Sequence, residues 1–226
     1  MANVVMVLGQ SGTGKSTSIK TLNPDETIII QALKKNLPFK GFKSLYSKEK
    51  KNLFYAHDGE QLVRYLKNIN EKCESCHTIV IDDATYIMRN EFFDKATESG
   101  FGKFTVLAQH FQQVLVTAAA MRDDIIVFLI MHSEEKINDG AIDSYKCATV
   151  GKMLDEKFDP IHCVTVLLYS SVRFDGEGKP NYGFYTNRTV ESNKVIPAKT
   201  PCDMFDEIFI PNDLQYVVDK INEYEN

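Results

Sequence analysis

The chain has 226 residues, of which 43% are hydrophobic and 25% charged, and its formal net charge is −5. This composition is ordinary for a soluble globular protein, and the length suits one domain with a sizeable core. The negative charge gives no general reason to expect nucleic acid binding, which would require a local basic patch. No signal peptide or membrane span is expected, and the five cysteines lack the spacing of a disulfide framework, so we expect a cytoplasmic protein.

Apolar runs alternate with helical patterns along the chain, which predicts an α/β fold with a mostly parallel central sheet and helices on both faces. The expected strands are Val4–Leu8, Thr27–Ile30, Leu53–Ala56, Thr78–Ile81, Ile125–Met131 and Val164–Tyr169. The expected helices are Ser16–Leu22, residues 58–70 with Asp58 as N-cap, residues 104–118 and residues 214–221.

Two further segments complete the predicted architecture. The polar stretch Ser133–Lys152 is expected to be a long loop, and loops of this length are usually functional. The segment Val172–Thr186 is expected to form a β-hairpin around a Gly-Pro-Asn loop. We therefore expect a single domain over residues 1–226, with a core up to about residue 170 and a C-terminal annex of hairpin and helix.

The sequence GQSGTGKS at Gly9–Ser16 has the spacing of a phosphate-binding loop, G-x-x-x-x-G-K-[ST], and follows an apolar strand. Its glycines allow a tight turn that points backbone N–H groups at an anion. Lys15 can reach the β- and γ-phosphates of a nucleotide, and the Ser16 hydroxyl can bind Mg²⁺. The predicted nucleotide-binding residues are Gly9, Gln10, Ser11, Gly12, Thr13, Gly14, Lys15, Ser16 and Thr17.

The strand Thr78–Ile81 delivers Asp82 to the carboxyl edge of the sheet, where it can hold Mg²⁺ together with Ser16. The next residue, Asp83, either orients or deprotonates the attacking water or caps the following helix. His132 ends another buried strand, where it either senses the γ-phosphate or is an ordinary packed or surface histidine. The predicted catalytic residues are Lys15, Asp82, Asp83 and His132.

A lysine-rich segment is the first candidate for nucleic acid binding. Leu33–Lys51 carries seven lysines and one glutamate, with Phe39, Phe42 and Tyr46 among them. Lysines neutralise phosphates and aromatic rings stack on unpaired bases, which together suit single-stranded DNA. Alternatively, the lysines are solvated and the phenylalanines anchor the core. The DNA-binding candidates are Lys34, Lys35, Lys40 and Lys43, and the Ser133–Val150 loop is a second candidate.

The order of these motifs resembles the RecA-like ATPases of bacteriophages, which are described as single-strand annealing or recombination proteins. The stretches LPFKGF, VGKMLDEK, AKTP and IPNDL support this resemblance in addition to the phosphate-binding loop. It implies a RecA-like P-loop NTPase core, Mg²⁺-dependent ATP hydrolysis, and action on single-stranded DNA in phage recombination, annealing or replication. It also implies a single-strand binding protein as partner, a homo-oligomer (ring or filament) and the host cytoplasm as location.

The resemblance leaves the general base open. RecA places a catalytic glutamate at the end of a strand beside the phosphate-binding loop, whereas the second strand here ends in Gln31. Asp83, Asp58 and Glu60 are the remaining candidates. No second positive charge is evident in the site, so a neighbouring subunit is expected to supply one. The candidates for this role in trans are Arg188, Lys194 and Lys199, with Lys199 slightly favoured.

Two other functions remain open: a small-molecule P-loop kinase, such as a nucleoside or nucleotide kinase, and a nucleotide-gated DNA loader or scaffold with little turnover. The arginines are never clustered as in a kinase lid. Cys73–His77 contains one C-x-x-C pair, which a zinc-bearing thymidine kinase would need twice. We expect this segment to be a helix-to-strand connection.

Overall fold

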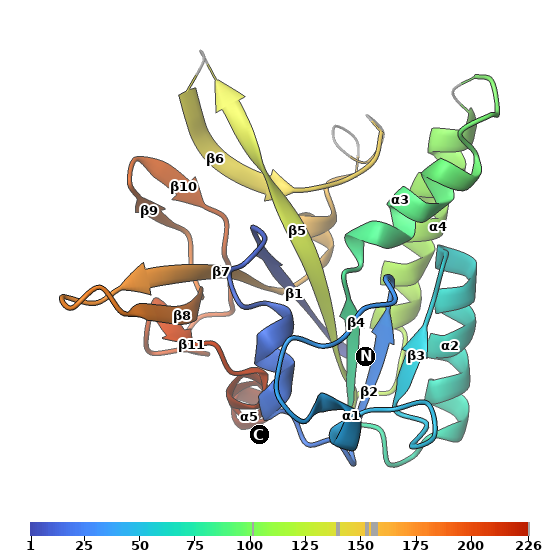
Figure 1. The fold of residues 1–226 in the computed structure, drawn as a ribbon, viewed down its shortest axis with the longest axis horizontal. Coiled ribbons are helices and arrows are strands. Elements are labelled where there is room, and N and C mark those ends of the chain that lie inside the picture. The colour runs from blue at the N-terminus through green and yellow to red at the C-terminus, as the bar shows by residue number, and fades with distance from the viewer. Residues whose placement is uncertain (101, 139–140, 152–153, 155–157, 226) are drawn as a thin grey trace.

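A computed structural model describes residues 1–225 except 101, 139–140, 152–153 and 155–157 (Figure 1). The strands are β1 Asn3–Gly9, β2 Thr27–Gln31, β3 Leu53–Tyr55, β4 Thr78–Asp82, β5 Ile126–Asn138, β6 Ala141–Cys147, β7 Val166–Phe174, β8 Pro180–Tyr185, β9 Thr189–Glu191, β10 Lys194–Ile196 and β11 Phe209–Pro211. The helices are α1 Phe42–Leu45, α2 Gly59–Lys72, α3 Thr85–Asp94, α4 Gly102–Ala119 and α5 Leu214–Glu225, with 3₁₀ helices η1 Ser16–Thr21 and η3 Pro160–Cys163.

The central sheet has the order β11-β8-β7-β1-β5-β4-β2-β3. The strands from β7 to β3 are all parallel, and β8 and β11 extend the sheet in antiparallel pairing. The strand that leads to the phosphate-binding loop, β1, therefore lies inside the sheet, with β5 between it and β4. The predicted α/β class with a mostly parallel sheet is confirmed.

Helices cover both faces of this sheet (Figure 1). Along β1, Met6 and Leu8 point into one apolar cluster, and Val5 and Val7 point into the other. The first cluster is completed by α2, α3 and α4, and the second by η1, α1 and α5. Because successive side chains of a strand point to opposite faces, a parallel strand buried on both sides is apolar throughout.

The helix predicted after the phosphate-binding loop is a short 3₁₀ helix, η1. The Ser18 hydroxyl donates to the carbonyl of Lys15 at 2.5 Å, and the Thr21 hydroxyl to that of Ser18 at 3.0 Å. Such bonds from serine and threonine to a carbonyl three residues earlier compete with the i to i−4 ladder of an α-helix. The side chains of this segment therefore favour a tighter and shorter helix than its apolar spacing indicates.

The predicted loop over Ser133–Lys152 is wrong for most of its length. Strand β5 continues through Asn138, and β6 returns antiparallel to it, with Ser133 opposite Cys147. Strand β10 pairs with β6 on its other side. The Asp139-Gly140 dipeptide is a strong hairpin signal in the sequence, although these two residues lie outside the described part of the chain. Most of the VGKMLDEK stretch also lies outside it.

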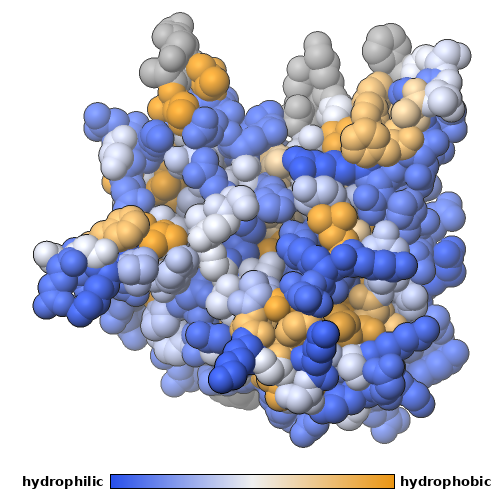
Figure 2. All heavy atoms as spheres, viewed as in Figure 1, coloured by the Kyte–Doolittle hydropathy of each residue, from blue (hydrophilic) through white to orange (hydrophobic). Residues whose placement is uncertain are grey.

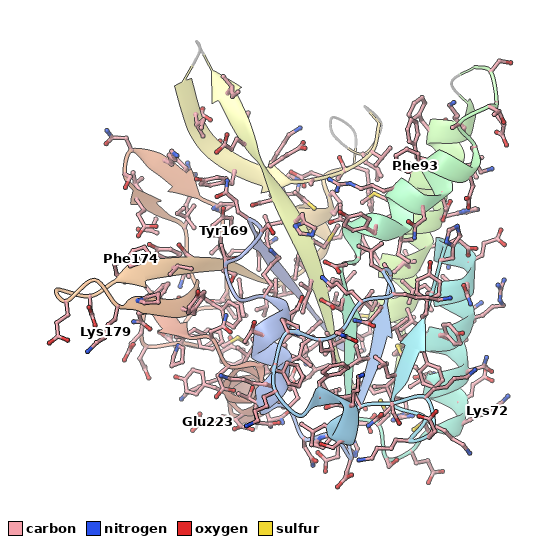
Figure 3. All side chains as sticks on the ribbon, in the orientation of Figure 1. Lys72, Phe93, Tyr169, Phe174, Lys179 and Glu223 are labelled. Carbon is pink, nitrogen blue, oxygen red and sulfur yellow. The ribbon has the colours of Figure 1, made fainter. Side chains whose placement is uncertain are left out.

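The hairpin predicted over Val172–Thr186 is present as β7 and β8, but its turn is not the Gly-Pro-Asn loop. The turn is closed by bonds between Asp175 and Lys179, and the Asp175 carboxylate accepts two further backbone N–H groups. Pro180 and Asn181 already belong to β8. The proline is tolerated because it is the first residue of the strand. Figure 3 shows Phe174 and Lys179 at the far end of this hairpin, away from the sheet centre.

Among the described residues, none of the helices has both the length and the apolar character needed to cross a membrane.

Candidate nucleotide-binding site

The loop between β1 and η1 packs closely against β7, β8 and the residue that follows β11. Gly14 has a φ of 92°, and a Cβ at this position would lie 3.0 Å from both Asn212 Nδ2 and Tyr182 Cδ1. A Cβ on Gly9 would lie 2.8 Å from the carbonyl oxygen of Ser170 in β7. Glycine is therefore required at both positions. Gly14 needs it for its backbone conformation and for the close approach of two side chains, and Gly9 needs it for the close approach of β7.

A pocket of about 610 Å³ opens over this loop. Six of the predicted nucleotide-binding residues line it, whereas Gly9, Gln10 and Thr13 lie in the loop without lining the pocket. The lining residues are Ser11, Gly12, Gly14, Lys15, Ser16, Thr17, Lys20, Lys35, Pro38, Asp83, His132, Tyr182 and Asn212. The size and the number of polar groups suit a nucleotide.

Lys15 is held inside the loop. Its side chain donates to the carbonyls of Gly9 at 2.8 Å and Gln10 at 2.6 Å, and the residue is 6% exposed. Burial lowers the pKa of Lys15 to about 8, with Lys35 adding to this effect and Asp83 opposing it. A bound nucleotide would therefore offer this ammonium group charged phosphate partners in place of the two carbonyls.

Ser16 and Asp82 meet although they are 66 residues apart in the sequence. The Ser16 hydroxyl donates to Asp82 Oδ1 at 2.7 Å, and Asp82 is fully buried beneath the pocket. Burial, and then the neighbouring charge of Asp83, raise the pKa of Asp82. Its second oxygen, Oδ2, has no hydrogen-bond partner among the described residues.

This pair fits Mg²⁺. The ion prefers oxygen ligands, and a hydroxyl beside a carboxylate with a free buried oxygen provides them. A bound divalent cation would also remove the cost of burying the charged form of Asp82.

Asp83 occupies an unusual backbone position at the start of the turn that leads into α3. Its φ is 56°, in the left-handed region, and its carboxylate pairs with Lys35 and with His132 Nε2, the latter at 3.3 Å. Burial alone would raise the pKa of Asp83, but the hydrogen bonds from His132 and Lys35 outweigh it and hold the pKa below its ordinary value. Asp83 is therefore ionised at neutral pH and faces the pocket.

His132 lies beside the phosphate-binding loop because β5 and β1 are in register there. Gly9 is its direct partner in the parallel ladder, and its backbone N–H donates to Thr85 Oγ1 at 3.0 Å. The imidazole contacts the ring of Tyr86 edge-on, with the centroids 6.0 Å apart. These contacts orient the imidazole toward Asp83.

Lys35 corrects the expectation that the site lacks a second positive charge. It follows β2, whose carboxyl end lies at the same sheet edge as Gly9 and Asp82, and its ammonium group contacts Asp83 inside the pocket. Sequence reasoning grouped Lys35 with the DNA-binding lysines. Its position four residues after the end of a parallel strand was the signal that could have placed it in the nucleotide site.

Tyr182 and Asn212 were missed by sequence reasoning. Tyr182 belongs to β8 and Asn212 follows β11, and both strands are brought to the phosphate-binding loop by the antiparallel side of the sheet. Tyr182 is 42% exposed, and the buried Asn212 Nδ2 has no hydrogen-bond partner among the described residues. No local pattern marks either residue, because only the strand order puts them here.

The aromatic residues of the lysine-rich segment do not form a base-stacking surface, which corrects that expectation. Tyr46 is buried, and Phe39 and Phe42 pack against the second apolar cluster, so these rings anchor the segment to the sheet. The four DNA-binding candidates are also dispersed. Lys35 lies in the nucleotide pocket, Lys34 stands over the ring of Tyr55, and Lys40 and Lys43 are exposed.

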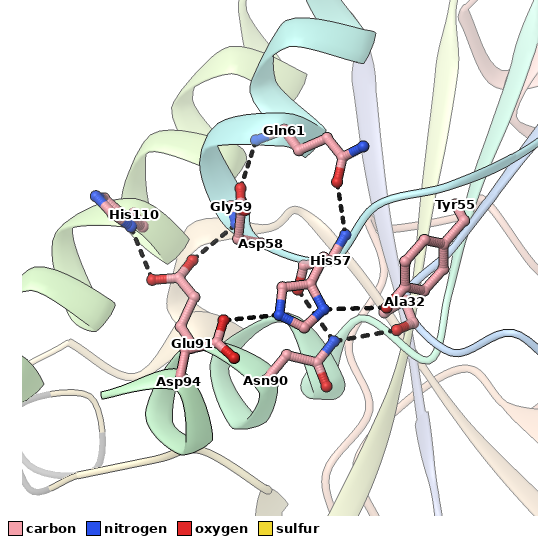
Figure 4. A network of polar contacts seen from close by, with 10 residues as sticks. All are labelled: Ala32, Tyr55, His57, Asp58, Gly59, Gln61, Asn90, Glu91, Asp94 and His110. Carbon is pink, nitrogen blue, oxygen red and sulfur yellow. Dashed lines mark hydrogen bonds and ion pairs between the residues drawn. The ribbon is translucent and has the colours of Figure 1, made fainter. Parts of the chain in front are cut away.

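Asp58 and Glu60, two candidates for the general base, serve α2 instead of the pocket. Asp58 caps the helix by accepting from the N–H of Gln61 at 2.7 Å, as predicted (Figure 4). Glu60 is exposed and lies 3.5 Å from His110 and 3.9 Å from Arg64. Neither residue lines the nucleotide pocket.

None of the three residues predicted to act in trans lines the nucleotide pocket of its own chain. Arg188 is exposed, and Lys194 is part of β10 with its ammonium 5.9 Å from the ring centre of Tyr145. Lys199 is held to β7 by two backbone hydrogen bonds with Leu167, at 2.8 and 2.9 Å. Lys194 thus lies in a short, partly buried strand, and Lys199 forms an isolated bridge with β7.

The cysteine pair between α2 and β4 is a structural connection. Arg122 donates to the carbonyls of Cys73 and Cys76, and the two thiols are free. Within the described residues, no group of three or more histidine, cysteine or acidic side chains is placed to hold a metal ion.

The parallel sheet, the phosphate-binding loop and the Ser16–Asp82 contact together define a P-loop nucleoside triphosphatase. The sequence model of a family described as an AAA domain matches residues 1–202. The chain therefore belongs to this family of AAA-type P-loop ATPases, in which nucleotide binding is the general activity. No curated protein matches the chain.

Proposed function

We propose that the protein hydrolyses ATP in the pocket above the phosphate-binding loop and acts on single-stranded DNA in phage recombination, annealing or replication. The observation that carries the ATPase proposal is the convergence of Lys15, Ser16 and the ionised Asp83 in one pocket, with Asp82 buried behind Ser16. Ser16 and Asp82 would hold Mg²⁺, which when bound neutralises phosphate charge.

The residues of the pocket have separate roles in this proposal. Lys15 binds the β- and γ-phosphates, and Lys35 approaches the γ-phosphate from its place beside Asp83. Asp83 accepts a proton from the attacking water. At the same time the water oxygen forms a bond to the γ-phosphorus, and the bond from this phosphorus to ADP breaks. His132 orients the Asp83 carboxylate through their 3.3 Å contact.

The DNA part of the proposal rests on charge and position. The lysine-rich segment leaves the carboxyl edge of the sheet next to the nucleotide pocket, and Lys34, Lys40 and Lys43 are exposed on it. The β5–β6 hairpin rises from the same edge, since β5 continues past His132. A single-strand binding protein as partner and a homo-oligomer remain predictions from the family resemblance.

One observation favours a second candidate, the small-molecule kinase. A further pocket of about 840 Å³ lies beside the nucleotide pocket and shares Lys35 with it. In a kinase, a phosphoryl acceptor would occupy such a place.

The experiment that tests these functions is ATP hydrolysis with and without single-stranded DNA, alongside nucleosides and nucleotides as acceptors. DNA-stimulated release of inorganic phosphate is the expected result. Transfer of the γ-phosphate to an acceptor would replace the proposal with the kinase, and the absence of both reactions would refute turnover.

A further inference from the structure

The pocket beside the nucleotide site lies at the carboxyl ends of β2 and β3, where the sheet ends. It is bounded by the segment that follows β2 and by the first turns of α2. In Figure 2 this part of the face shows apolar surface framed by hydrophilic side chains.

Three lysines border the pocket: Lys34, Lys35 and Lys48. Lys34 and Lys48 are exposed and have no ion-pair partner among the described residues, while Lys35 pairs with Asp83 in the neighbouring site. Lys34 Nζ lies 4.7 Å from the ring centre of Tyr55. The positive charge at this rim is thus available to an anion.

A buried amide faces the same pocket. Gln31 is 5% exposed, and its Nε2 has no partner within hydrogen-bond geometry among the described residues, although its side chain interacts with the carboxylate of Asp82. It ends β2, in register with Asp82 on one side and Tyr55 on the other. The amide therefore lies between this pocket and the carboxylate of the nucleotide site.

The aromatic wall of this pocket, made by Phe54, Tyr55 and Tyr65, is held by contacts within the protein. The rings of Phe54 and Tyr65 are 5.5 Å apart, and the Tyr55 hydroxyl lies 3.1 Å from His57 Nδ1. His57 in turn pairs with Asp94 at 2.7 Å (Figure 4). Because these contacts are made within the protein, the wall needs little ordering when a ligand binds.

We propose that this second pocket binds one nucleotide unit, with its phosphate at Lys34 and Lys48 and its base against the aromatic wall. Cations beside aromatic faces are the chemistry that recognises a phosphate joined to a base. The unit can come from a free mononucleotide or from a single strand of DNA, and the second source rests on the proposed function. Lys35 borders both pockets, so an anion bound here competes with Asp83 for its ammonium group.

Binding is tested in the full chain carrying Lys15→Ala, which weakens occupancy of the ATP pocket. The probes are dTMP and a short oligo(dT) of about ten nucleotides. The test variant adds Lys34→Gln and Lys48→Gln. The matched control adds Lys67→Gln and Lys72→Gln, two exposed lysines of α2, of which Lys72 lies at the far end of the helix in Figure 3. Titration calorimetry gives the Kd of each protein.

The expected result is that at least one probe binds and that only the pocket variant weakens it. For oligo(dT), the slope of log K against log salt should become shallower by about 0.7, the value for one lost phosphate contact, because the proposal places a single phosphate at the two lysines. In the same background, Tyr65→Leu should weaken either probe by roughly 5- to 150-fold through lost stacking.

The probe that binds identifies the source. Binding of neither probe, or equal losses in the pocket variant and the control, would overturn the proposal. ATP hydrolysis by the parental protein is measured separately, so a failed ATPase and a failed second pocket give different results.

Discussion

At the residue scale, the Ser16–Asp82 contact brings together the two predicted Mg²⁺ ligands, one from the phosphate-binding loop and one from the end of β4. Asp82→Asn keeps the shape of the side chain and one oxygen but removes the charge that would bind Mg²⁺. We expect nearly unchanged ATP binding and a kcat lower by roughly 10²–10³-fold, as for other lost transition-state contacts. Hydrolysis across a Mg²⁺ titration measures this, and parental kinetics would remove Asp82 from the site.

Lys35 is the second cation of the pocket, and its role can be separated from that of the distant lysines. Lys35→Gln should lower kcat by roughly 10²–10³-fold, because it removes a charge that faces the γ-phosphate position. Lys199→Gln is the control, since Lys199 is held by backbone bonds and its side chain does not line the pocket. The opposite order of effects would restore the expectation of a cation supplied in trans.

At the element scale, the cap of α2 distinguishes a structural carboxylate from a catalytic one. Asp58→Ala removes the acceptor for the Gln61 N–H and should lower the free energy of unfolding by about 1 kcal/mol. Asp58→Asn keeps a capping oxygen and should be close to parental in denaturant titrations. Both variants should hydrolyse ATP at the parental rate, whereas a rate loss in both would make Asp58 the general base.

The antiparallel side of the sheet contributes Tyr182 and Asn212 to the nucleotide pocket, which predicts a role in holding the base. Tyr182→Ala should weaken ATP binding by about 1–3 kcal/mol, the range for an aromatic ring stacked on a base. Binding of tripolyphosphate, which has no base, should not change. Tyr224→Ala, at an exposed position on α5, serves as control. Equal losses for ATP and tripolyphosphate would contradict a base contact.

At the scale of the whole molecule, nucleotide binding should stabilise the fold, because the pocket joins both sides of the sheet. A ligand at about 100 times its Kd adds about 2.7 kcal/mol to the free energy of unfolding. For a chain of this length, Tm should rise by roughly 5–10 °C with Mg²⁺ and ATP.

Lys15→Ala should abolish this rise and the hydrolysis, because it removes the ammonium nearest the β- and γ-phosphates. Thermal unfolding with and without nucleotide measures the effect. A full shift in the Lys15→Ala protein would mean that ATP binds elsewhere.

The sequence by itself determined the parallel strands, the phosphate-binding loop and the position of Asp82 at a strand end. These features follow from apolar runs and from motifs within a few residues, which act through local geometry and burial. The cap at Asp58 was predictable for the same reason. The turn of the β7–β8 hairpin was harder to predict, because the side chain of Asp175 closes it.

Only the tertiary structure decided which distant residues share a pocket. Strand order carries Tyr182 and Asn212 to the phosphate-binding loop, and the parallel register of β2 and β4 puts Lys35 beside Asp83. The tertiary structure also decided the burial of Phe39 and Phe42, because it depends on which face of the sheet their segment covers. Periodicity shows which face of an element is buried but not which distant element covers it, and therefore a single sequence does not reveal these neighbours.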